Sequence, residues 1–110
     1  MKDSMVDMFE QEGALFVEVD LPGVRREHVG VETQGSQLLI WAERPSEEPA
    51  RRYRLRGRRM SREYTHDLSL PPEARADDAT AHLDRGVLQV RIPLSAAADP
   101  RRSCAIEVGG

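Results

Sequence analysis

The stretch Ala81-His82-Leu83-Asp84-Arg85-Gly86-Val87-Leu88-Gln89-Val90-Arg91-Ile92-Pro93 decides the fold of this chain. Apolar residues take every second position on both sides of Asp84-Arg85-Gly86: Ala79, Ala81 and Leu83 before it, and Leu88, Val90 and Ile92 after it. Period-two patterning around a turn that contains glycine predicts a β-hairpin with one buried face. Gly86 can adopt the positive φ of a tight turn at low cost, and Pro93 ends the second strand because it has no amide hydrogen to donate.

Further runs along the chain place apolar residues on one face of an extended segment and are predicted as strands. They are residues 14–20, 29–32, 38–44 and 63–70, with Leu15, Val17, Val19, Leu38, Ile40, Tyr64, Leu68 and Leu70 facing inward. A mixed segment, Met5 to Gln11, precedes them, and no run has the length and period of a long helix. We count seven or eight strands separated by short turns, which predicts an all-β fold, an antiparallel immunoglobulin-like β-sandwich.

The length of 110 residues corresponds to one domain, and the composition limits what that domain can do. Aromatic residues make up 5% of the chain, so aliphatic side chains must fill most of the core. A net charge of −3 argues against general affinity for nucleic acid or for anionic membranes. The single cysteine, Cys104, excludes an intramolecular disulfide and fits a reducing compartment. Because the chain shows neither a signal-peptide pattern nor an apolar run of membrane-spanning length, we expect a cytoplasmic protein.

The sequence shows no pattern that is typical of an enzyme. His28, His66 and His82 are its only histidines, and none stands at a spacing known for a nucleophile or a metal site. Isolated glycines offer no phosphate-binding loop. We therefore expect no catalytic residues, no cofactor and no metal.

Positive charge is concentrated in one irregular segment, Arg44 to Arg62, which contains eight arginines and two glutamates. Since this segment carries a charge of +6 and the whole chain carries −3, the remainder carries −9. Such a distribution favours contact between the segment and a second copy of the acidic body. A solvated loop is the next interpretation, and nucleic-acid binding ranks third because only Tyr53 offers an aromatic ring among the arginines.

Four short motifs follow one another along the chain: the turn Leu21-Pro22-Gly23, the strand end Leu70-Pro71, the hairpin start Gly86-Val87-Leu88, and the tail pair Ile106 and Val108. Their order resembles that in the α-crystallin domain of small heat-shock proteins of the bacterial type. The chain resembles this family from Met5 to Val108. It departs from the family pattern at Ala42, where a glycine is usual, and at His66, where an arginine is usual.

The resemblance implies a division of the chain and a set of binding residues. A sandwich domain would span residues 1–93 with a dimerisation loop at 44–62, and a flexible extension would span 94–110. The dimer interface is expected at Arg52, Tyr53, Arg54, Leu55 and Arg56. A groove for the tail or for a client is expected at an exposed edge, lined by Val29, Val31, Ala81 and Leu83.

Ile106 and Val108 would anchor the tail in this groove. Two residues separated by a single residue point to the same side of an extended strand, so the pair can add to the groove as a strand. Packing of the pair on its own domain is the simpler alternative, and the sequence leaves open which subunit owns the groove. We expect a neighbouring subunit, because the linker Leu94 to Arg102 could span roughly 30 Å when extended.

The resemblance implies an ATP-independent chaperone, a holdase that binds partly unfolded proteins and prevents their aggregation under stress. Its partners would be unfolded clients, further copies of itself in a homodimer or larger oligomer, and ATP-driven chaperones downstream, with no nucleic acid and no membrane. Two alternatives remain: a CS-domain co-chaperone adaptor that binds a folded partner, and a nucleic-acid-binding module that uses the Arg-rich segment. The Arg-rich segment and the tail pair favour the holdase over the adaptor, and an affinity that falls steeply with salt would favour the nucleic-acid module.

Overall fold

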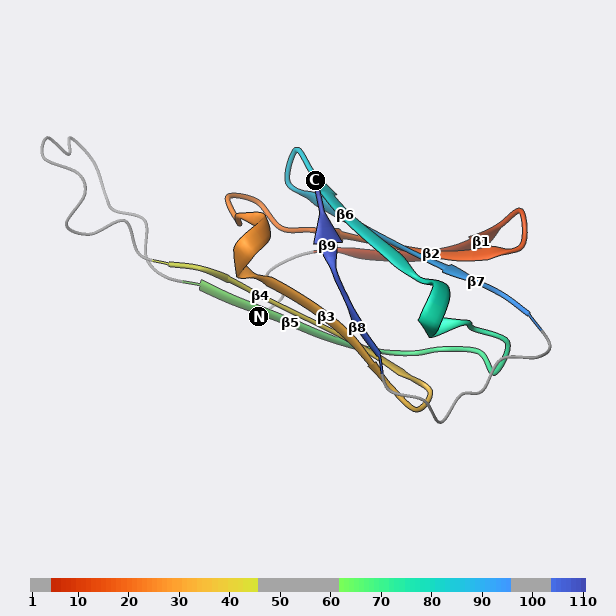
Figure 1. The fold of residues 1–110 in the computed structure, drawn as a ribbon. Coiled ribbons are helices and arrows are strands. Elements are labelled where there is room, and N and C mark those ends of the chain that lie inside the picture. The colour runs from red at the N-terminus through yellow and green to blue at the C-terminus, as the bar shows by residue number, and fades with distance from the viewer. Residues whose placement is uncertain (1–4, 46–61, 96–103) are drawn as a thin grey trace, which may run out of the picture.

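The computed structural model describes residues 5–45, 62–95 and 104–110. Within these ranges the chain forms nine strands and two short 3-10 helices, arranged as two sheets packed face to face (Figure 1). The strands are β1 (Val6–Gln11), β2 (Ala14–Asp20), β3 (Val29–Gln34), β4 (Gln37–Arg44), β5 (Arg62–Ser69), β6 (Thr80–Asp84), β7 (Val87–Pro93), β8 (Cys104–Ile106) and β9 (Val108–Gly109), and the helices are η1 (Arg26–His28) and η2 (Ala76–Asp78). The prediction of an all-β sandwich is confirmed.

One sheet has the strand order β1-β2-β7-β6-β9, and the other has the order β5-β4-β3-β8. Neighbouring strands are antiparallel, except that β9 runs parallel to β6. The described strands exceed the expected seven or eight, because the mixed segment Met5 to Gln11 forms β1 and the tail supplies two strands. β1 lacks a clean alternation since it is an outer strand, in which only Val6 and Phe9 are partly shielded from solvent.

The hairpin predicted from the opening stretch is confirmed as β6 and β7. Its two-residue turn, Arg85 and Gly86, has φ values of 54° and 80°. Positive φ at both central positions is the type I′ turn, whose twist matches that of the flanking strands. The Leu21 amide donates a hydrogen bond of 2.7 Å to the Gly86 carbonyl oxygen, so the turn is tied to the Leu-Pro-Gly turn that follows β2.

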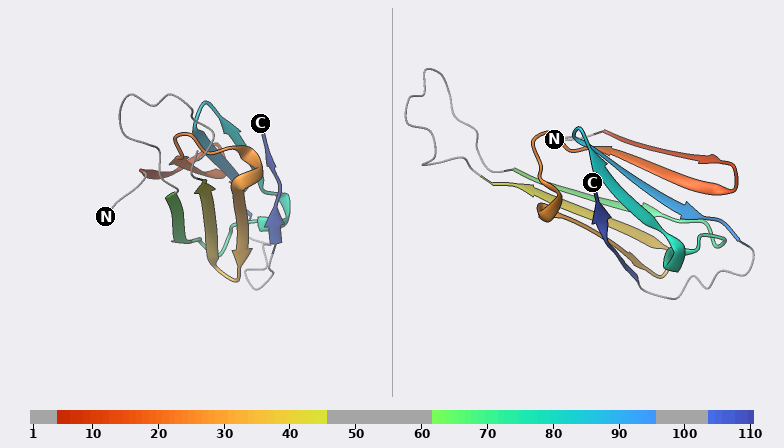
Figure 2. Two further views of the ribbon diagram at one scale, coloured as in Figure 1. Left: turned by 90° about the vertical axis from the view of Figure 1, so that its left-hand side faces the viewer. Right: turned by 45° about the horizontal axis from the view of Figure 1, so that its top comes forward.

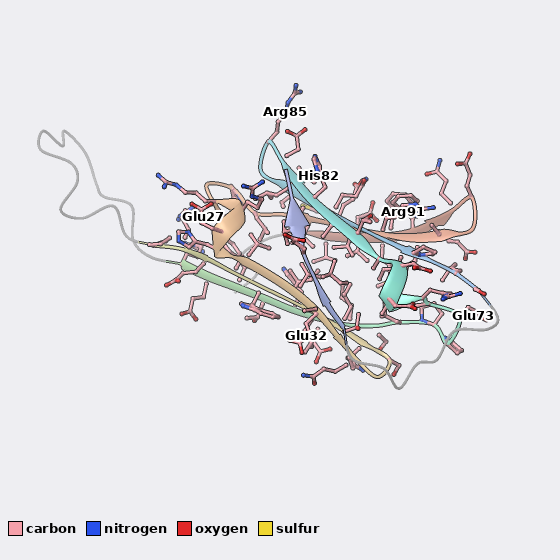
Figure 3. The ribbon with its side chains drawn as sticks, viewed as in Figure 1. Glu27, Glu32, Glu73, His82, Arg85 and Arg91 are labelled. Carbon is pink, nitrogen blue, oxygen red and sulfur yellow. The ribbon has the colours of Figure 1, made fainter. Side chains whose placement is uncertain are left out.

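The core lies between the sheets and consists mostly of aliphatic side chains. On β7, Leu88, Val90 and Ile92 are each fully buried, and they stand opposite the inward-facing residues of β2. The predicted inward faces are confirmed: Leu15, Val17, Val19, Leu38, Ile40, Tyr64 and Leu70 are buried, and Leu68 packs against them. Charged and polar side chains such as those of Glu32, Arg85 and Arg91 lie on the outside (Figure 3).

Leu94 and Ser95, which were expected to begin a flexible linker, lie on the sandwich. Leu94 forms a β-bridge with Ala74, and its amide donates to the Gly13 carbonyl oxygen at 2.9 Å. The Ser95 amide donates to the Glu73 carbonyl oxygen at 2.7 Å. The chain therefore remains fixed to the sheet through Ser95. Within the described ranges, no helix is long and apolar enough to cross a membrane.

Candidate functional site

Residues 104–110, called the tail below, lie along one side of the sandwich and pair with both sheets (Figure 2). β8 is antiparallel to β3, with Ile106 opposite Val31. β9 is parallel to β6, with Val108 opposite Ala81. The tail thus passes from one sheet to the other across the single residue between β8 and β9.

The two apolar tail residues face the sandwich interior. Ile106 is 7% exposed and belongs to the hydrophobic core, and Val108 is half-buried and packs against that core. Glu107 between them is exposed. Successive residues of an extended chain point to opposite sides, so one alternation places both apolar side chains inside and the carboxylate in water.

The four groove candidates lie on the two strands that the tail joins. Val31 and Ala81 are buried core residues, and Val29 and Leu83 are half-buried and pack against the same core. Together with the tail residues they form one apolar cluster between β3 and β6. The part of this cluster that β3 and β6 contribute is called the groove below. Its walls belong to the core, and in the described sheets the outer neighbour of each of these two strands is the tail.

In this single chain the tail pairs with the groove strands of its own sandwich, and docking in a neighbouring subunit stays a prediction. The alternative that the sequence left open, packing of the tail on its own domain, is the arrangement that this single chain adopts.

The chemistry of the groove is that of strand addition. Without the tail, β3 and β6 would be the outer strands of their sheets, with backbone N–H and C=O groups available to an extended peptide. Apolar side chains at alternate positions of such a peptide would enter the space that Ile106 and Val108 fill. The site is therefore suited to binding extended apolar segments and contains no reactive group.

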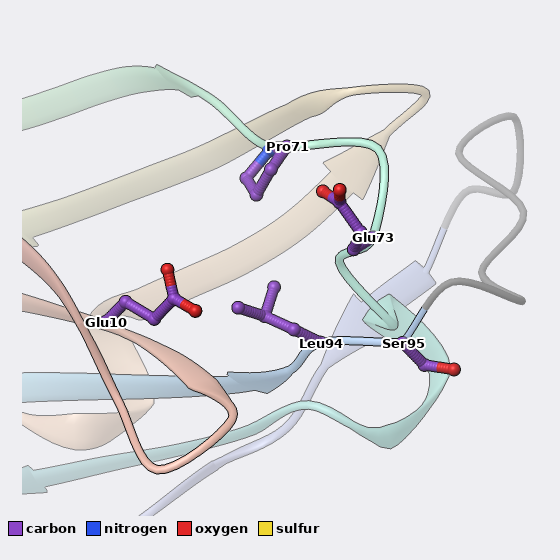
Figure 4. Close-up of a pocket in the computed structure, with 5 residues that line it drawn as sticks. All are labelled: Glu10, Pro71, Glu73, Leu94 and Ser95. Atoms are coloured by element: carbon purple, nitrogen blue, oxygen red, sulfur yellow. The ribbon is translucent and has the colours of Figure 1, made fainter.

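Hollows on the described surface include the following two. One, of about 600 Å³, continues beside the tail and is lined by Arg26, Ala79, Thr80, Ala81, Glu107, Val108 and Gly109. The other, of about 290 Å³, is lined by Glu10, Pro71, Glu73, Leu94 and Ser95 (Figure 4). Sequence reasoning found neither, because each brings together segments that are far apart in the chain.

Sequence reasoning also missed a contact on the outer face of β3 and β4. Trp41 is 46% exposed and stands opposite Gly30. Its indole lies directly over the glycine, and a Cβ added at Gly30 would overlap the ring carbons Cε2 and Cζ2. A glycine inside a strand, paired with an aromatic residue on the next strand, is the signal that could have indicated this contact.

The remaining candidates are the expected dimer residues and the three histidines. The expected dimer residues Arg52, Tyr53, Arg54, Leu55 and Arg56 lie outside the described residues. His82 is exposed, His66 is half-buried, and His28 is half-buried with its Nδ1 atom enclosed and without a hydrogen-bond partner. Across the described ranges, no three His, Cys, Asp or Glu side chains are grouped so that they could hold a metal ion.

Known proteins share both the sequence pattern and the fold of this chain. Residues 7–109 match the model of the Hsp20/alpha crystallin family. The chain is 34% identical over 110 residues to the 16.9 kDa class I heat shock protein 1 of Triticum aestivum, covering 98% of this chain and 72% of that protein. It is 37% identical over 91 residues to the 18.9 kDa heat shock protein of Oryza sativa subsp. japonica, covering 80% of this chain and 51% of that protein.

Two bacterial structures show the same architecture. The hspA of Xanthomonas axonopodis superposes with a TM-score of 0.70 at 33% identity, covering 86% of this chain and 96% of that chain. A small heat-shock protein from Xylella fastidiosa superposes with a TM-score of 0.71 at 32% identity, covering 99% of this chain and 98% of that chain. With the motifs, the sandwich and these matches in agreement, the chain belongs to the Hsp20/alpha crystallin family of small heat-shock proteins.

Proposed function

We propose that this protein is an ATP-independent holdase, which binds partly unfolded proteins and prevents their aggregation. The observation that carries the proposal is the groove, where apolar side chains lie between two sheet edges under a short tail. Unfolding proteins expose apolar segments and strand edges, and these can add to the groove as the tail does. Membership of the small heat-shock protein family supports a chaperone role.

The free energy that holds the tail in place is the difference between opposing contributions. Burial of Ile106 and Val108 contributes about 1.5–3 kcal/mol for each side chain. Ordering the tail backbone costs about 1–2 kcal/mol for each residue, which offsets most of the gain from burial and strand pairing. A client segment that competes for the groove can therefore displace the tail by mass action, without nucleotide.

The proposed unit is a homodimer that forms through Arg52, Tyr53, Arg54, Leu55 and Arg56. β1 is a suitable acceptor for this segment, because it is an outer strand of its sheet and carries the exposed carboxylates of Asp7 and Glu10. An extended arginine-containing segment could pair with β1 through its backbone while its charges meet the acidic residues. Exchange of tails between dimers would produce larger species at high concentration.

The proposed holdase acts in the cytoplasm and passes its clients to ATP-driven chaperones. Because it holds clients and does not refold them, refolding requires a second machine that supplies energy. This part of the proposal rests on family membership and on the passive nature of strand addition.

Light scattering from a heat-denatured client, in buffer without ATP, tests the holdase. We expect the purified protein at several-fold excess over the client to suppress the rise in scattering. A protein that leaves scattering unchanged, yet binds a folded partner, would be an adaptor instead. A protein that binds nucleic acid with an affinity that falls steeply as salt rises would be a nucleic-acid module.

Sedimentation velocity tests the dimer. Deleting Glu47 to Gly57 removes the proposed contact, so we expect the deleted protein to sediment as a monomer while the full chain sediments as a dimer. If the deleted protein remains dimeric, another surface forms the dimer.

A further inference from the structure

We propose that the groove recognises its occupant at a third position, Gly110, in addition to Ile106 and Val108. The groove would accept only a residue without a side chain there, so that Gly110 is a specificity-determining residue for docking. This inference rests on the proposed function, in which the groove binds an extended segment. It adds a rule for which segments can occupy the whole groove and which can occupy only part of it.

The first observation is the space around Gly110. A Cβ built on this residue would overlap the carbonyl oxygen of Leu83, and it would lie 3.3 Å from the carbonyl carbon and 3.4 Å from the amide nitrogen of the same residue. These are backbone atoms of β6, and Leu83 is held in register with Leu88 of β7. Because the neighbour is a strand in the sheet and not a flexible side chain, it cannot yield to a methyl group.

The second observation is the contrast with Gly109. A Cβ on Gly109 would meet only the Ala81 carbonyl oxygen, at 3.7 Å, which is an ordinary van der Waals contact. Gly109 has no positive φ, whereas Gly110 has a φ of 152°. Two adjacent glycines therefore differ in what they require, and only Gly110 excludes a side chain.

The third observation is Arg26, which stands over the end of the tail. Its Nη1 atom lies 3.5 Å from the backbone oxygen of Gly110, and η1, to which Arg26 belongs, is in contact with β9. Arg26 also lines the hollow beside the tail together with Glu107. At this distance and exposure the hydrogen bond is weak, so Arg26 guides the end of the tail and is not its main attachment.

The segment that fits the whole groove has an isoleucine-like residue, a valine-like residue two positions later, and a glycine two positions after that. A client segment with any other residue at the last position must leave β6 after the second apolar contact. The protein's own tail satisfies all three positions, so it competes for the full groove while most client segments compete for the β3 half and the Val108 site. Such partial competition allows a client to be held and still be displaced by the returning tail.

The matched pair Gly110→Ala and Gly109→Ala, each in the full-length chain, tests the rule by hydrogen exchange. We expect Gly110→Ala to lower the protection of the tail amides in β8 and β9 by about tenfold, and Gly109→Ala to change it by less than about twofold. Protection of amides in β2 and β7 serves as the folding control and should be equal in all three proteins. Unchanged tail protection in Gly110→Ala, or equal loss in both variants, would overturn the inference.

The same three proteins, measured for suppression of client aggregation, separate this inference from the proposed function. A wild-type protein that fails to suppress aggregation, while the two variants differ in tail protection as expected, would remove the holdase and leave the docking rule intact. A protein that suppresses aggregation, while the variants show no difference in tail protection, would remove the rule and leave the holdase intact.

Discussion

β7 and the tail both pair with β6, but the sequence specifies the β6–β7 hairpin and the tail pairing in different ways. The hairpin strands are joined by two residues and remain in register from Thr80 opposite Arg91 to Asp84 opposite Val87. The tail pairs with β6 at only two positions, and its other strand belongs to a different sheet. Local alternation and a turn specify the hairpin, whereas the tail depends on a groove that exists only after the sheets have packed.

This difference predicts that the hairpin is scaffold and that the tail is exchangeable. Every apolar residue that β7 turns inward is fully buried between two strands, so the hairpin cannot open without unfolding the core. The tail covers an outer edge of each sheet, so we expect it to leave while both sheets persist. The four substitutions below test this distinction, from the largest expected effect to the smallest.

Leu88→Ala should destabilise the whole domain. Leu88 is fully buried, so the substitution removes apolar contacts and leaves a cavity that the packed sheets cannot close. We expect the free energy of unfolding to fall by about 2–5 kcal/mol in chemical denaturation. A loss below about 1 kcal/mol would show that the side chains around Leu88 can move to fill the cavity, and that the hairpin core is not rigid scaffold.

Replacing both tail residues, Ile106→Ala with Val108→Ala, should release the tail and spare the sandwich. We expect the tail amides to lose protection from hydrogen exchange while β2 and β7 keep theirs, at a cost of about 2 kcal/mol or less in global stability. Sedimentation at rising concentration should show the loss of species larger than the dimer. Loss of protection throughout β7 as well would mean that the tail is part of the scaffold.

Gly86→Ala tests the hairpin turn, where the φ of 80° favours glycine. Placing a Cβ in this conformation costs about 1–2 kcal/mol, and the surrounding atoms leave room for it, since the nearest lies 3.8 Å away. We therefore expect a loss of about 1–2 kcal/mol in thermal or chemical unfolding, with the register of β6 and β7 unchanged in the pattern of protected amides. A shifted pattern of protected amides would show that the turn determines the register of β6 and β7, and not only the free energy of forming the hairpin.

Arg26→Ala should have the smallest effect. Its hydrogen bond to Gly110 is exposed and 3.5 Å long, so we expect global stability to change by less than about 0.5 kcal/mol. Tail protection should fall by no more than about threefold, and less than in Gly110→Ala. Arg26→Lys serves as the control for charge, and an effect of Arg26→Ala as large as that of Gly110→Ala would make Arg26 the principal attachment.

Much of the fold could be predicted because its strands are amphipathic and its turns are marked. Leu15, Val17 and Val19 take every second position of their strand, and so do Leu88 and Val90 on the neighbouring strand, which places each set on one buried face. β1 could not be predicted in the same way, because an outer strand exposes most of its residues and loses the pattern. The two short strands of the tail contain too few residues to show a period at all.

The residues of the candidate site fall into the same two groups, those that could be predicted from the sequence and those that could not. Ile106 and Val108 were identifiable from their spacing in a polar tail, and Val31 and Ala81 from their place in the family pattern. The exclusion of a side chain at Gly110 could not be predicted, because it arises from the Leu83 carbonyl oxygen, which no local pattern connects with the tail. The contact of Trp41 with Gly30 likewise requires the register of β3 and β4.

Side-chain alternation and turn residues are properties of neighbouring residues, so they can be recognised in the sequence. They were sufficient to predict the sandwich and its buried faces. The partner of the tail, its passage from β3 to β6, and the different demands at Gly109 and Gly110 depend on distances between atoms that are far apart in the chain. Those distances exist only when two packed sheets place the edges of β3 and β6 side by side.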